Sequence, residues 1–359
     1  MGYGIRTSEN MKLAFPMFGS GRTGGNKVIF KLANESIRRG HEVSLLSSRQ
    51  IEPPPDTLAK IEQIALFPVP VVPYLAPTIV SSASFPYAKK LRGFDAIVAN
   101  YGPTCLAAKL VGGENVKRYY LVQHDETSFF SRLTLEYWVT RLSYTAFEEG
   151  RIFVVSRWLQ DMIRKRCGHG SVIVPPGIDH DTYYPRSRGS HSGKRVLVLS
   201  RSEGWRGLQI FLDAMESVRK EVKDVKIVAA GHSGSSLRTS CPVEYVRPSD
   251  DELANLYASS DVFVLPSFLE GLPVPPLEAM ACGGAVVLTD CMGTRDYAVD
   301  RENCLMVPSK DSDSLADAIL RAITDDSLSG KLRRNGPSAA APWTYERMGR
   351  IFVDSLESE

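Results

Sequence analysis

The 359-residue sequence predicts an α/β protein with two Rossmann-like domains. Apolar strands alternate with amphipathic helices from Met11 onward. A polar segment at Tyr184–Ser192 interrupts this alternation, which restarts at Arg195. Strands that alternate with helices form parallel sheets with helices on both faces. The chain is long enough for two such domains, and we expect them to face each other across a cleft at the carboxyl ends of their strands.

The first half begins with an expected strand at Met11–Met17 and a glycine-rich loop at residues 19–25. The following helix runs from Asn26 to Arg39 and ends at Gly40, since glycine commonly terminates a helix. The remaining strands are expected at Glu42–Leu46, Ile61–Phe67, Asp95–Ala99, Arg118–Val122, Ile152–Val155 and Val172–Val174. The remaining helices are expected at Leu133–Phe147 and from the capping residue Ser156 to Arg166.

The second half repeats the pattern. Ser249 is expected to cap a helix at Asp250–Ala258, because a serine side chain can accept a hydrogen bond from the first helical turn. Pro275 and Pro276 open another amphipathic helix, since proline fits the first turn. The strands expected here are Arg195–Leu199, Val225–Ala229, Val262–Leu265 and Ala285–Leu288. The other helices are Leu208–Lys220 and Ser314–Ile323.

These elements divide the chain into four parts. Residues 1–10 are expected to be a loose leader, residues 11–185 an N-terminal domain and residues 186–340 a C-terminal domain. Residues 341–359 form a C-terminal helix that could pack back on the N-terminal domain.

The composition is that of a globular protein, with 43% hydrophobic residues. No apolar run is long enough to cross a bilayer, and residues 1–10 lack the apolar core of a signal peptide, so we expect a cytoplasmic protein. The six cysteines form neither a CxxC pair nor a cluster with zinc spacing. We therefore expect reduced thiols that pack as small hydrophobes.

The formal net charge of +2 is unevenly distributed. Residues 1–180 contain 22 Lys and Arg against 15 Asp and Glu. This basic half could face an acidic acceptor or an anionic membrane surface. Ordinary solvated surface is the favoured interpretation, because the sequence has no dense run of like charge. No nucleic-acid partner is expected.

The most informative segment runs from Glu270 to Met280. It follows an apolar strand and leads into a helix whose N-terminus would favour anions, phosphate above all. Glu278 lies just over two helical turns beyond Glu270 and so returns near the same face. The arrangement suits a nucleotide sugar, with the diphosphate at the helix end and the two carboxylates on sugar and ribose hydroxyls. Taken singly, each glutamate is more commonly a cap or a solvated helix residue.

Arg201 and Arg206 flank the turn after the first strand of the second half. Two cations there could clamp a diphosphate and stabilise its charge as it leaves. The alternative is a pair of surface arginines beside Glu203. The Glu270 loop, a second helix terminus in the same half, favours the diphosphate interpretation.

Two features of the first half are more ambiguous. Gly24 and Gly25 let the backbone approach a ligand closely, but a flexible turn without function is equally consistent. Residues 19–24 match GxGxxG, yet no well-placed acidic residue follows the second strand, so this is not the dinucleotide fingerprint. His124 ends an apolar strand, where it could contact a sugar or share a proton with an acceptor hydroxyl. A hydrogen-bonded structural histidine is the favoured interpretation from the residues alone.

Taken together, these segments resemble a family 4 glycosyltransferase of the GT-B fold. The resemblance extends from Met11 to about Ile323. It is strongest where Glu270 and Glu278 match the family's Glu-x7-Glu signature. The segments that carry the rest are Gly24-Gly25, residues 39–43, residues 174–179 and Arg201 with Arg206-Gly207.

The resemblance implies transfer of a sugar from a nucleoside-diphosphate donor with retention at the anomeric carbon. It implies that Glu270 holds the donor sugar and that Glu278 binds the ribose. The backbone N–H groups that would assist Glu270 belong to Gly271, Leu272 and Val274. Arg201 and Arg206 would grip the diphosphate. The other residues implied in the site are Gly24, Gly25, His124, Gly231 and Arg247.

The resemblance also implies that catalysis rests on His124, Glu270, Arg201 and Arg206 and needs neither metal nor cofactor. The donor site would lie on the C-terminal domain and the acceptor site on the N-terminal domain. A UDP- or GDP-linked sugar is the expected donor. Arg206 stands where the family usually has lysine, and Arg247 where a glycine is frequent, so the sequence leaves the base open.

The sequence thus predicts a metal-independent, retaining, hexosyltransferase-like enzyme with an unidentified acceptor. Two alternatives stay open at this point. A sugar-nucleotide epimerase on the same architecture would release an isomer without any acceptor. A non-catalytic partner protein would bind a nucleotide sugar without turning it over.

Overall fold

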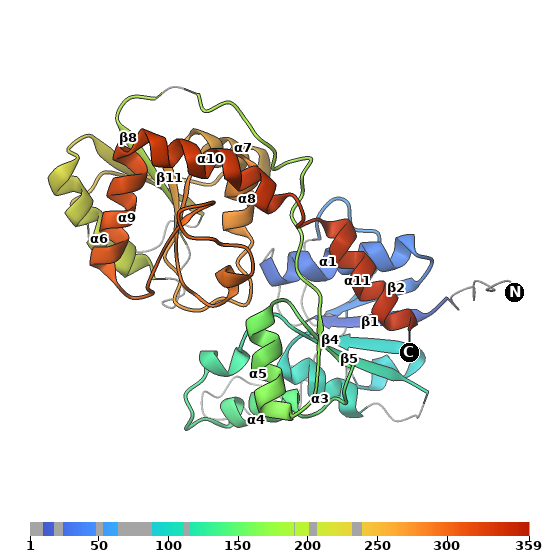
Figure 1. The fold of residues 1–359 in the computed structure, drawn as a ribbon. Coiled ribbons are helices and arrows are strands. Elements are labelled where there is room, and N and C mark those ends of the chain that lie inside the picture. The colour runs from blue at the N-terminus through green and yellow to red at the C-terminus, as the bar shows by residue number, and fades with distance from the viewer. Residues whose placement is uncertain are drawn as a thin grey trace, which may run out of the picture. The chain divides into compact units, whose positions relative to one another are not determined.

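The chain forms two compact units in the computed structural model (Figure 1). Unit 1 contains Met1–Pro176 and Tyr345–Glu359, and unit 2 contains Gly177–Thr344. The structure describes residues 10–17, 24–47, 53–63, 88–110, 115–189, 191–200, 207–231 and 239–358. Residues 1–9 of the expected leader therefore lie outside the described residues.

Unit 1 contains a parallel sheet with the strand order β3-β2-β1-β4-β5-β6-β7. The order reverses between β1 and β4, which makes their carboxyl ends a switch point where ligands commonly bind. The strands are β1 (Lys12–Met17), β2 (Glu42–Ser47), β3 (Lys60–Gln63), β4 (Ala96–Ala99), β5 (Lys117–Val122), β6 (Ile152–Val154) and β7 (Val172–Ile173). Each expected strand of this half is confirmed, although residues 64–67 of the third lie outside the described residues.

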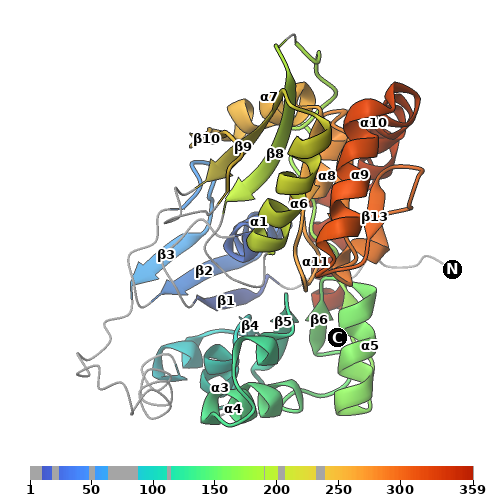
Figure 2. The ribbon, with the colours of Figure 1, turned by 90° about the vertical axis from the view of Figure 1, so that its left-hand side faces the viewer.

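The helices of unit 1 connect successive strands (Figure 2). They are α1 (Gly24–Arg38), η2 (Leu91–Gly93), α3 (Gly102–Leu110), η3 (Glu126–Phe129), α4 (Leu135–Tyr144) and α5 (Arg157–Cys167). The C-terminal helix α11 (Tyr345–Glu357) packs against α1. Its Phe352 ring contacts Phe15 and Phe153, with ring centroids 6.0 and 5.1 Å apart. The last helix of the chain is therefore part of the core of unit 1.

Unit 2 contains a second parallel sheet, with the order β10-β9-β8-β11-β12-β13. Its switch point lies between β8 and β11. The strands are β8 (Lys194–Ser200), β9 (Val225–Gly231), β10 (Val243–Val246), β11 (Val262–Leu265), β12 (Val286–Thr289) and β13 (Leu305–Val307). The sequence predicts neither β10 nor β13. Both sheets confirm the predicted doubly wound α/β class.

The helices of unit 2 include one confirmed cap and one correction. Ser249 forms a full capping box with Glu252 at the start of α7 (Asp250–Ser259), as predicted. The proline-headed helix α8 (Pro275–Ala281) is buried from Pro276 to Ala281. The prediction of an amphipathic helix here was wrong, because α8 packs against α7, α10 and the sheet. The other helices are α6 (Leu208–Glu221), η5 (Gly293–Asp296), α9 (Ser312–Thr324) and α10 (Asp326–Ala340).

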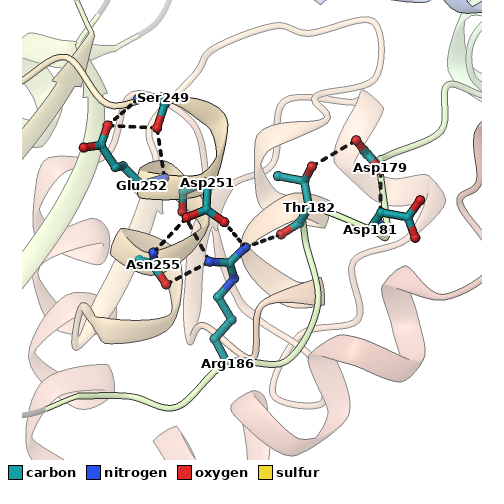
Figure 3. A network of polar contacts seen from close by, with 8 residues as sticks. All are labelled: Asp179, Asp181, Thr182, Arg186, Ser249, Asp251, Glu252 and Asn255. Atoms are coloured by element: carbon teal, nitrogen blue, oxygen red, sulfur yellow. Dashed lines mark hydrogen bonds and ion pairs between the residues drawn. The ribbon is translucent and has the colours of Figure 1, made fainter. Parts of the chain in front are cut away.

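The division between the units falls after Pro176, earlier than the expected boundary after residue 185. Residues beyond 176 are attached to unit 2, as Figure 3 shows for Arg186. Its guanidinium forms an ion pair with Asp251 of α7 at 2.7 Å and donates to the Asn255 side chain at 2.9 Å. The polar segment Tyr184–Ser192, whose composition is typical of a linker, is therefore tied to the surface of α7 through Arg186.

Candidate active site

The predicted donor site lies at the carboxyl edge of the sheet in unit 2. The buried strand β11 ends at Leu265, and its loop continues to Glu270. The hydroxyl of Ser267 donates to Glu270 Oε1 at 2.9 Å, while the Glu270 amide donates to the carbonyl of Cys291 at 3.0 Å. The loop that follows β12 thus fixes the backbone of Glu270, and Ser267 orients its carboxylate.

Gly293 packs closely against the backbone of this loop. A Cβ atom on Gly293 would overlap the carbonyl oxygens of Gly271 and Glu270. The hydroxyl of Tyr297 also donates to the carbonyl of Pro273 at 2.9 Å from a buried position. The segment between Glu270 and α8 therefore has little freedom to shift.

The Gly293→Ala variant should consequently be less stable and should bind the donor more weakly. The added methyl group must displace the Glu270 backbone, and such overpacking typically costs roughly 1–3 kcal/mol. Urea unfolding and donor titration would measure the two effects. Gly93→Ala is the control, since a Cβ atom there meets nothing within 4 Å. Equal stability and donor affinity in the two variants would contradict this account.

Glu278 lies at the end of the first turn of α8 and has only 9% of its surface exposed. The hydroxyl of Tyr257, on α7, donates to Glu278 Oε2 at 3.2 Å. The interpretation of this glutamate as a solvated helix residue is therefore wrong. Burying a carboxylate is costly without compensating contacts, so its retention in a packed helix is consistent with a binding role.

The structure brings part of the predicted cationic loop to the same edge. Arg201 and Arg206 themselves lie outside the described residues. Gly207, which follows them, has a φ of +67°, and a Cβ atom there would overlap the carbonyl oxygen of Pro266. The loop after β8 therefore ends against the start of the Glu270 loop, at the switch point of the sheet.

Two further predicted donor residues of unit 2, Gly231 and Arg247, lie at other strand ends. Gly231 closes β9 with a φ of +130°, and a Cβ atom there would come 2.5 Å from the carbonyl oxygen of Ser200. Close strand pairing therefore explains this glycine without a ligand. Arg247 is exposed after β10 and lines a hollow of about 410 Å³ along α7. That hollow is lined by neither Glu270 nor Glu278.

The predicted residues of unit 1 also gather at one sheet edge. Gly24 and Gly25 begin α1, and a Cβ atom on Gly25 would come 3.4 Å from the side chain of Gln123. The neighbouring His124 is partly exposed after β5 and stacks on Phe129, with ring centroids 4.7 Å apart. The structure thus places the paired glycines near the strand end that carries the histidine.

A buried carboxyl group that the sequence did not predict lies beside this histidine. Glu126 is 4% exposed at the start of η3. Tyr120 donates to its Oε1 at 3.1 Å, and the amide of Gly102 donates to its Oε2 at 3.0 Å. Its own amide donates to the hydroxyl of Tyr144 at 2.9 Å. Glu126, two residues after His124, therefore connects β5, α3 and α4.

Burial raises the pKa of Glu126 to about 8, and the charge of Asp125 acts in the same direction. Asp125 behaves differently. Burial opposes its ionisation, but hydrogen bonds from Arg166 and Thr127 lower its pKa. Arg166 holds both Asp125 oxygens, at 2.9 and 2.7 Å. Two neighbouring carboxyl groups therefore have opposite protonation preferences, and both fix the segment after His124.

Two parallel α/β units, each with a switch point in its strand order, define the class of doubly wound proteins. Family models identify the particular family. Residues 22–182 match the model "Glycosyltransferase Family 4", and residues 193–325 match "Glycosyl transferases group 1". The chain belongs to the family 4 glycosyltransferases, as the Glu-x7-Glu signature predicted.

Individual relatives agree with this assignment. A D-inositol 3-phosphate glycosyltransferase of Corynebacterium urealyticum is 25% identical over 52% of this chain and 50% of its own length. Sucrose-phosphate synthase from Thermosynechococcus elongatus superposes with a TM-score of 0.81 at 17% identity, over 98% of this chain and 100% of that chain. Anabaena HepE in complex with UDP-glucose gives 0.77 at 16% identity, with coverage of 98% and 100%. These structures show the GT-B fold for the present chain, which spans about half the length of the curated relatives it matches.

Within the described ranges, no helix is both long and apolar enough to cross a membrane. The six cysteines are all in the free thiol form, and five of them are buried.

Proposed function

We propose that this protein transfers a sugar from a nucleoside-diphosphate donor to an acceptor hydroxyl, with retention at the anomeric carbon. The observation that supports the proposal most strongly is the pair Glu270 and Glu278, which flank the start of α8 and are held by a partly buried hydrogen bond from Ser267 and a buried one from Tyr257. Carboxylates accept hydrogen bonds from hydroxyl groups, and such charge-assisted bonds are the strong ones. In the proposed complex, Glu270 holds the sugar and Glu278 holds the ribose.

In the proposed reaction, the bond between the anomeric carbon and the diphosphate oxygen breaks, and its electron pair leaves with the diphosphate. Arg201 and Arg206 offset the developing negative charge, without a metal ion. The acceptor oxygen forms the new bond on the same face and loses its proton. His124 contacts the sugar or receives that proton. The acceptor binds to unit 1, where an excess of cations suits an anionic or lipid-linked molecule.

A UDP-linked sugar is the first donor to test, because the similar Anabaena protein was solved with UDP-glucose. At a hundred times its dissociation constant, the correct donor should raise the free energy of unfolding by about 2.7 kcal/mol. Unfolding in the presence of UDP-glucose, GDP-mannose, UDP or GDP would measure the shift. ATP is the control. No stabilisation by any nucleotide sugar would contradict the proposed donor.

The reaction itself is tested with the donor that stabilises the protein most. Incubation with a panel of acceptors should give a product whose anomeric configuration, determined by NMR, equals that of the donor. An inverted product would overturn the retaining mechanism. An isomerised donor formed without any acceptor would indicate an epimerase instead.

A further inference from the structure

The helix α4 and the residues before it expose an unusual group of large apolar side chains. Leu133 is 96% exposed, and on α4 the values are 55% for Leu135, 52% for Trp138 and 64% for Leu142. Phe129, just upstream, is 44% exposed. Single exposed apolar residues need no explanation, but a contiguous group of this kind marks an interaction surface.

The polarity of α4 is inverted relative to an ordinary surface helix. Its inward residues are polar or hydroxyl-bearing, namely Thr140, Ser143 and Tyr144, and each is at most 3% exposed. Residues 135, 138 and 142 lie on one side of a helix, because positions three, four and seven apart share a face. The apolar stripe therefore points to solvent instead of the core.

This orientation is fixed by contacts that the inner face makes with the rest of unit 1. The hydroxyl of Tyr144 accepts from the Glu126 amide at 2.9 Å, and the Tyr144 ring stacks on Tyr120 of β5, with ring centroids 5.8 Å apart. On the outer face, the indole N–H of Trp138 donates to the carbonyl of Arg132 at 3.1 Å. Rotating the helix to hide the stripe would break the Tyr144 contacts, so the exposed leucines are a stable feature of unit 1.

The charges nearest the stripe are mainly basic. Arg132 and Arg141 are exposed beside it, whereas Glu136 of the same helix is only partly exposed. The neighbouring helix α5 carries the exposed cations Arg164 and Lys165 together with one exposed acid, Asp161. Figures 1 and 2 both show α4 at the surface of its unit, on the side away from β1.

We propose that this surface, formed by Leu133, Leu135, Trp138 and Leu142 with Arg132 and Arg141, binds an anionic lipid bilayer. Leucine and tryptophan on one face with arginine beside them are typical of helices that lie in the bilayer interface. The arginines attract anionic headgroups, and the apolar side chains enter the acyl boundary. A bilayer suits this surface better than a protein partner does, because the most exposed residue, Leu133, projects from a loop instead of lining a groove. The proposal does not depend on the sugar-transfer reaction.

Flotation of the full chain with vesicles tests the proposal. The protein should float with phosphatidylcholine vesicles that contain phosphatidylglycerol, and much less with phosphatidylcholine alone. Combining Leu135→Ser, Trp138→Ser and Leu142→Ser should lower the bound fraction by roughly tenfold or more. Combining Arg132→Gln with Arg141→Gln should remove most of the preference for the anionic vesicles.

The matched control is Val299→Ser, because this residue of unit 2 is 55% exposed outside the stripe. It should float like the wild-type protein. Far-UV circular dichroism would verify that all variants are folded, which is expected because each change is on the surface. Equal flotation of the stripe variant and the wild-type protein would overturn the proposal. A second result would also overturn it: no vesicle binding, together with a mass in sedimentation that differs between the wild-type protein and the stripe variant. That result would assign the surface to a protein contact.

Discussion

Replacing Glu126 with glutamine is expected to raise the free energy of unfolding at pH 7 by roughly 3 kcal/mol. The buried carboxyl group has a pKa of about 8 in the folded chain, compared with an ordinary value of 4.5. Between these two values the unfolded chain releases a proton that the folded chain keeps. The stability contributed by the protonated Glu126 is therefore fully present below pH 4.5 and declines as the pH rises toward 8.

Glutamine imitates the protonated acid. Its carbonyl oxygen can accept from the Gly102 amide, and its NH₂ group can donate to the hydroxyl of Tyr120. Urea unfolding at several pH values between 5 and 8 should give a declining free energy for the wild-type protein and a flatter profile for Glu126→Gln. Glu148→Gln, which changes an exposed glutamate of the same unit, should follow the wild-type profile. The explanation fails if Glu126→Gln is less stable than the wild-type protein at pH 7.

The second large effect concerns sugar transfer. Glu270→Ala should lower kcat/KM by roughly 100-fold, because hydrogen bonds to a charged group contribute about 1.5–3 kcal/mol. Removing this carboxylate also leaves the hydroxyl of Ser267 without the acceptor that it contacts at 2.9 Å. Initial rates with the identified donor and acceptor would measure the loss.

The control for this variant is Asp317→Ala, which removes an exposed carboxylate from α9 in the same unit. Its kcat/KM should stay at the wild-type value. Glu278→Ala provides a second comparison. It should raise the KM for the donor, because the proposed contact with the ribose is lost. It should also lower the free energy of unfolding, because it leaves an unfilled space beside Tyr257. If Glu270→Ala retains the wild-type rate, the proposed role of this carboxylate is wrong.

The elements that the sequence predicted well have local signals. Ser249 with Glu252 is a capping pair that can be read directly from residue spacing, and the structure confirms it. The apolar strand Val262–Leu265 was predicted with its exact bounds because its four residues are buried on both faces. In such cases the local sequence and the tertiary environment favour the same structure.

The elements that were missed lack such signals. The edge strand β10 is only partly buried, so Val243–Val246 shows no continuous apolar run. The helix α10 contains Gly336 and Pro337, which both lower helix propensity. Gly336 is nevertheless suited to this position, because a Cβ atom there would come 3.0 Å from the carbonyl oxygen of Met280 on α8. Close packing between two helices explains this residue, and that packing is not readable from the local sequence.

The candidate site was predictable to a similar extent. The spacing of Glu270 and Glu278 singled out this loop as a candidate, but the contacts with Ser267 and Tyr257 join residues from separate elements. Glu126 gave no usable signal, because a glutamate next to an aspartate after a strand is usually solvated. Its burial depends on Tyr120 and Gly102, which the fold brings together.

The return of the chain to unit 1 at its C-terminus has a practical consequence for dissecting this enzyme. Unit 2 is an insert whose two ends meet, since the amide of Ile178 donates to the carbonyl of Trp343 at 2.9 Å. A fragment that stops at Pro176 would lack Phe352 and would expose the ring of Phe15 to solvent. Excising the insert and joining residue 176 to residue 345 would instead preserve that core, so unit 1 is best isolated by deletion and not by truncation.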